Sequence, residues 1–80
     1  MKHSTALVLQ CSAEHQRLIV GVHKHPELLR VLDDVATLCS LLAFDHVHAY
    51  RRGLSDSEDW IATIQMALTY IKQYTPQRVH

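Results

Sequence analysis

Residues 26–53 read PELLRVLDDVATLCSLLAFDHVHAYRRG, and this stretch decides the fold. Apolar residues recur along it every three or four positions, as they do on one face of an α-helix. Pro26 suits the first position of a helix, and Gly53 suits the residue that ends one. The sequence therefore predicts a helix from about residue 26 to 52. Its apolar seam consists of Leu28, Leu32, Val35, Cys39 and Leu42.

A second helix is predicted after a short break. Ser55 and Glu58 have the spacing of a capping box, in which each residue satisfies a backbone N–H of the other. Thr75-Pro76 ends the apolar pattern, so this helix is expected from about residue 56 to 74. Because the connection has only a few residues, the two helices are expected to be antiparallel neighbours. The second seam consists of Trp60, Ile64, Ala67, Ile71 and Tyr74.

The N-terminal part of the chain shows a different pattern. Residues 5–11 read TALVLQC and residues 17–23 read RLIVGVH, and apolar residues alternate within both runs. Such alternation in segments rich in aliphatic and β-branched residues predicts two strands, joined here by the polar residues 12–16. A β-hairpin over about residues 5–23 is not stable alone, so it has to pack on the helices. We therefore expect one α+β domain over residues 1–80, with ββαα order.

Several segments resemble a family of small pseudomonad proteins of unknown function with a helical hairpin. The matching pieces span about residues 18–72. The resemblance implies a bacterial, cytoplasmic helical hairpin, and it carries over no activity and no site residue. The pieces are Val20-Gly21-Val22, Glu27-Leu28-Leu29, Leu42-Ala43, Trp60 with Ala62, and Met66-Ala67-Leu68.

Two apolar residues interrupt the polar half of the first predicted helix. Leu41 and Phe44 are one turn apart and lie among charged and polar side chains. They are either isolated exposed residues, which are common on protein surfaces, or part of a contact with another protein. We predict that Thr37, Leu41, Phe44 and His48 line an interface, within a homodimer or with another protein partner.

Composition excludes several classes of protein. Eight basic and eight acidic residues give a net charge of zero, which disfavours binding to the phosphate backbone of nucleic acids. The apolar run Ala6–Leu9 is too short for a secretory signal, and no segment is long enough to span a membrane. With Cys11 and Cys39 as its two cysteines, the chain is expected to be cytoplasmic with free thiols.

No catalytic constellation, metal site or cofactor motif is recognisable, so we predict that the protein is not an enzyme and carries no cofactor. His46 lies on the core stripe and is expected to be a half-buried, hydrogen-bonded residue. The leading prediction is a non-enzymatic interaction module, acting as a small regulator, adaptor or inhibitor. One alternative is a small ligand- or metal-responsive binding protein in which His23, His25 and Cys11 converge. The other is a nucleic-acid-associated regulator that uses Arg51 and Arg52.

Overall fold

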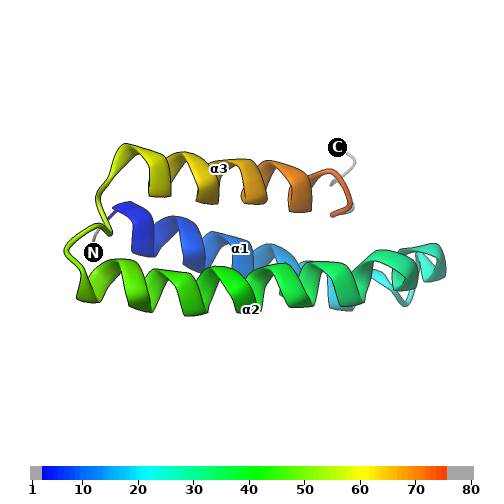
Figure 1. The fold of residues 1–80 in the computed structure, drawn as a ribbon. Helices are drawn as coiled ribbons and strands as arrows, with labels where there is room; N and C mark the ends of the chain where they lie inside the picture. Colours follow the sequence, from blue (N-terminus) through cyan, green and yellow to red (C-terminus); the bar gives the residue numbers. More distant parts are fainter. Residues whose placement is uncertain (1–2, 76–80) are drawn as a thin grey trace.

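The structure, a computed structural model, describes residues 3–75 and contains three α-helices joined by short connections (Figure 1). Helix α1 spans His3–Gly21, α2 spans Leu29–Arg51 and α3 spans Glu58–Lys72. A short 3₁₀ turn, η1, covers Pro26–Leu28 and leads directly into α2. The described part of the chain is therefore an all-α domain.

Helix α1 lies between the other two helices. In Figure 1, α2 runs antiparallel to α1, and α3 returns in the direction of α1. Both α2 and α3 pack along α1, whereas they contact each other much less. The N-terminal segment is thus the centre of the fold, and much of the surface of α2 and α3 is left without a partner helix.

The predicted β-hairpin over residues 5–23 is wrong, and with it the α+β fold of ββαα order. Residues 3–75 contain no strand. The alternation of Leu7, Leu9 and Cys11 fits a strand, but Leu7, Cys11 and Leu18 also follow helical spacing, and these three are buried while Leu9 is exposed. Residues 12–16 read SAEHQ and contain no glycine or proline, so nothing in them breaks a helix.

The ends of the other two helices agree with the sequence only in part. Gly53 has φ 72°, the left-handed conformation that terminates a helix, as predicted. The predicted start of the second helix is displaced: Ser57, not Ser55, is its N-cap, and the Ser57 hydroxyl accepts a hydrogen bond from the backbone N–H of Trp60. Ser55 is instead buried in the connection between α2 and α3.

All three helices contribute to the core. Both predicted seams are buried or partly buried, which confirms the helical periodicity of α2 and α3. The predicted pairing of the two seams with each other is replaced largely by packing on α1, because α1 lies between the two helices. The buried apolar residues are Leu7, Cys11 and Leu18 of α1, Val35 and Leu42 of α2, and Ile64 and Ile71 of α3.

Candidate functional site

The most prominent candidate site is a row of side chains on the outer face of α2. We call Thr37, Leu41, Phe44 and His48 the α2 stripe. Their spacing of four, three and four residues places them along one line on the helix. All four are exposed, and 55% of Leu41 and 64% of Phe44 is accessible. The rings of Phe44 and His48 contact each other edge to face, with centroids 4.6 Å apart. The stripe is therefore a continuous surface.

A second, smaller group of exposed side chains lies on α3. The pKa of Tyr70 is raised, mainly by its hydrogen bond with Tyr74 and to a smaller extent by the charge of Asp34. On the outer side of α3, Met66 and Tyr70 line a shallow hollow, and 74% of Met66 is accessible.

Exposed apolar residues also occur away from the α2 stripe. Sequence reasoning missed two of those on α1, Leu9 and Val20, because the strand pattern assigned both to sheet faces. Val20 in particular has an accessible fraction of 70%. The 3.6-residue period is the signal that would have identified them, since Val20 lies opposite Leu18 on a helix. Further exposed apolar residues are Ile19, Leu29, Val47, Tyr50 and Leu54.

A polar cluster joins the three helices around His46. The indole N–H of Trp60 donates to Nδ1 of His46 over 3.1 Å, and Nε2 of His46 lies 3.0 Å from Oγ1 of Thr5. Indole nitrogen can only donate, so Nδ1 carries the lone pair and Nε2–H donates to Thr5. The ring planes of His46 and Trp60 differ by only 16°, which is compatible with a hydrogen bond in the plane of both rings. The predicted half-buried, hydrogen-bonded role of His46 is confirmed; Thr5 was missed because residues 5–11 were assigned to a strand.

The two thiols are close together but poorly suited to chemistry. The thiol of Cys39 donates a hydrogen bond to the backbone carbonyl of Cys11 over 3.6 Å. Burial, together with the neighbouring Cys39, raises the pKa of the Cys11 thiol to about 11, and burial also raises the pKa of Cys39. Since the thiolate is the nucleophilic form, both groups are unreactive at neutral pH. They act as core residues between α1 and α2.

The residues of the metal-binding alternative do not come together. His23 and His25 lie in the connection after α1, whereas Cys11 is buried halfway along that helix. His25 is instead 3.4 Å from the carboxylate of Glu27. Within residues 3–75, no group of three histidine, cysteine or acidic side chains is arranged to hold a metal ion.

Arg51 and Arg52, the residues of the nucleic-acid alternative, are exposed, but acidic residues follow them closely in the sequence. Arg51 and Arg52 end α2, and Glu58 and Asp59 begin α3 after a short connection. Carboxylates this close along the chain oppose the approach of phosphates to the two guanidinium groups.

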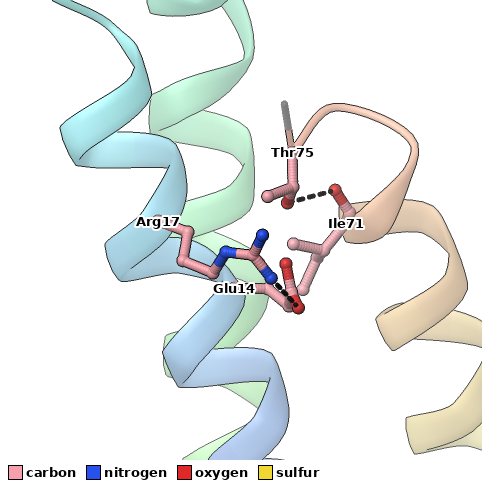
Figure 2. A network of polar contacts seen from close by, with 4 residues as sticks. All are labelled: Glu14, Arg17, Ile71 and Thr75. Carbon is pink, nitrogen blue, oxygen red and sulfur yellow. Dashed lines mark hydrogen bonds and ion pairs between the residues drawn. The ribbon is translucent and has the colours of Figure 1, made fainter. Parts of the chain in front are cut away.

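The opposite end of the domain holds local polar contacts. Arg17 Nη1 donates to Glu14 Oε1 over 3.3 Å, and the Thr75 hydroxyl donates to the carbonyl of Ile71 over 3.3 Å. Figure 2 shows both contacts where α1 meets the end of α3. Each contact joins residues that are three or four positions apart, so both act locally. The mostly apolar hollow beside them is lined by Gln16, Arg17, Val20, Gly21 and Thr75.

Comparisons with protein-family models, with curated proteins and with solved structures find no match for this chain. The resemblance to small pseudomonad proteins therefore stays a prediction. None of the helices within residues 3–75 has the length and apolar character needed to cross a bilayer.

Proposed function

We propose that this protein is a non-enzymatic interaction module that acts in the cytoplasm through contact with other proteins, as a small regulator, adaptor or inhibitor. Its α2 stripe binds a second copy of the chain, and the resulting homodimer is the form that a further partner recognises. The observation that carries this proposal is the exposure of Leu41 and Phe44, side by side in the middle of the longest helix.

Burial of these two side chains offers a sizeable driving force. Covering one large apolar side chain completely contributes about 1.5–3 kcal/mol. Since 55% of Leu41 and 64% of Phe44 is still accessible, covering both contributes roughly 2–4 kcal/mol per chain. A two-fold dimer buries the same residues twice, because each copy presents the same surface. The 4-3-4 spacing of the α2 stripe is also the spacing by which two helices interlock along their length.

The electrostatics of the whole chain allow self-association. The net charge is zero, so two copies do not repel each other at long range. Because α2 and α3 contact each other only sparsely, part of the surface of α2 remains open to a second copy. These features favour a homodimer over a lone domain.

The test removes the two apolar side chains and measures mass in solution. Leu41→Ser plus Phe44→Ser is compared with the wild type and with Val20→Ser plus Leu29→Ser, which removes two equally exposed apolar residues from other positions. We expect dimers for the wild type and the control, and a monomer with unchanged helical content for the first variant. Dimers of equal stability in all three proteins would overturn the proposal.

A further inference from the structure

The α2 stripe is symmetric about a point between Leu42 and Ala43. Leu41 and Phe44 lie at equal distances on either side of this point, and so do Thr37 and His48. A two-fold axis that crosses the interface at the level of this point packs two copies of α2 antiparallel. Leu41 of one copy then lies level with Phe44 of the second copy. Thr37 is then level with His48 of the second copy. The apolar pair forms the centre of such a contact, and the polar pair forms its border.

Four charged residues towards the two ends of α2 are placed symmetrically about the same point. Asp34 and Arg51 are equally far from the centre of the stripe, and Asp33 and Arg52 follow one position further out. At 1.5 Å per residue, these groups lie about 13 Å along the helix from the axis. In the antiparallel arrangement, Asp34 is level with Arg51 of the second copy, and Asp33 is level with Arg52. Each end of the contact thus brings two acids to two bases.

Within residues 3–75, none of these four charges forms an ion pair. All four side chains are exposed. In the part of the chain that the structure describes, the ion pairs join Arg17 to Glu14 and His25 to Glu27, and none involves the charges at the two ends of α2. The four groups are therefore available to a partner surface.

The parallel arrangement of two copies is disfavoured by the same residues. It would place Asp34 level with Asp34 and Arg51 level with Arg51. Like charges at the same level repel, and opposite charges attract, most strongly where an interface excludes water. The charge pattern of α2 therefore selects one orientation for a second copy.

We infer that two copies pair through α2 in an antiparallel register centred between Leu42 and Ala43, with the Asp33–Asp34 pair of each copy at the level of the Arg51–Arg52 pair of the other. This inference rests on the proposed homodimer and adds its orientation, its register and its polar contacts.

Charge reversal tests the register directly. A basic variant carries Asp33→Lys and Asp34→Lys, and an acidic variant carries Arg51→Glu and Arg52→Glu. In the antiparallel register, a homodimer of either variant brings like charges together at both ends of the contact. A heterodimer of the two variants instead brings every charge level with an opposite charge. The control carries Asp59→Lys and Lys72→Glu on α3, where both side chains are exposed.

We expect each charge variant alone to dissociate at least about tenfold more readily than the wild type, measured by light scattering and sedimentation. An equimolar mixture, followed by native mass spectrometry, should form the heterodimer in preference to either homodimer. The heterodimer should weaken as salt rises, because salt screens its ion pairs. The control should match the wild type, and circular dichroism should show equal helix in every protein.

Two results would overturn the register: charge variants that dimerise as tightly as the wild type, or a mixture that yields no preferred heterodimer. Either result leaves the proposed homodimer standing if Leu41→Ser plus Phe44→Ser still gives a monomer. If that double variant remains dimeric, the α2 stripe itself is not the interface, and the proposed function fails with it.

Discussion

Trp60 on α3 donates its indole N–H to Nδ1 of His46 on α2, and the far side of the same imidazole reaches Thr5 on α1. One side chain thus joins all three helices, including α2 and α3, which otherwise contact each other sparsely. This hydrogen bond fixes the tautomer of His46 and orients the start of α3.

Replacement of Trp60 by phenylalanine should destabilise the domain by about 1–3 kcal/mol. The change removes the donor and leaves Nδ1 of the half-buried His46 without its partner. Urea denaturation followed by circular dichroism, at one fixed protein concentration, measures the effect. Met66→Ala on the same helix is the control, because Met66 is exposed and should change stability by less than about 0.5 kcal/mol. Equal midpoints for both variants would show that the His46 contact contributes nothing.

Leu18→Ala and Val20→Ala distinguish the helix from the hairpin in the N-terminal segment. In a strand the two residues share a face, whereas on α1 Leu18 is fully buried and Val20 is 70% accessible. Leu18→Ala should cost about 2–5 kcal/mol because it leaves a cavity in the core. Val20→Ala should be close to neutral, since alanine is the better helix former. Similar losses for the two variants would contradict the position of α1.

The N-cap of α3 offers a third test. Ser57→Ala should cost about 1 kcal/mol, because the hydroxyl no longer accepts from the N–H of Trp60. Ser57→Asp keeps an acceptor at that position and should retain the stability of the wild type. Thermal unfolding of both variants measures the difference. If Ser57→Asp loses as much as Ser57→Ala, the cap is not the source of the effect.

Stability should fall in alkaline solution through Cys11. Burial raises the pKa of its thiol to about 11 in the folded chain, from 9.0. Between these values the folded state holds the proton more strongly than the unfolded state, so the free energy of unfolding decreases as pH rises. The loss reaches roughly 2 kcal/mol by pH 11, and the full value of about 3 kcal/mol, from two units at about 1.4 kcal/mol each, is approached only above that pH.

Comparison with Cys11→Ala measures this effect. The variant should show a shallower decline of unfolding free energy between pH 9 and 11. Part of the decline should remain, because Cys39 also has a raised pKa. Parallel pH profiles for the two proteins would contradict the assignment to Cys11.

The sequence predicts α2 and α3 well because their signals do not conflict. Pro26 and Gly53 bracket the apolar period of the first helix, and the seams of both helices are buried or partly buried. The first 21 residues carry two patterns at once, since Leu7 and Cys11 fit both an alternating and a helical period. The β-branched residues Val20 and Val22 favoured the strand interpretation. Tertiary packing decides between the two, because α1 fills the space between α2 and α3.

The candidate site could be predicted in part. The positions of Leu41 and Phe44 on the polar half of α2 follow from helical geometry alone, and both are exposed in the structure. The partners of His46 could not be derived, because they depend on which helices meet. The symmetry of Asp34 and Arg51 about the stripe is present in the sequence, but it acquires meaning only once both are seen to be exposed and to form no ion pair within residues 3–75.

Self-association of the wild-type chain tests the central claim most directly. Light scattering from about 1 to 100 μM at pH 7.5 should give twice the chain mass of 9.2 kDa over the upper part of this range, and the mass should fall on dilution. A mass of one chain at every concentration would contradict the homodimer, and with it the role that we assign to Leu41 and Phe44.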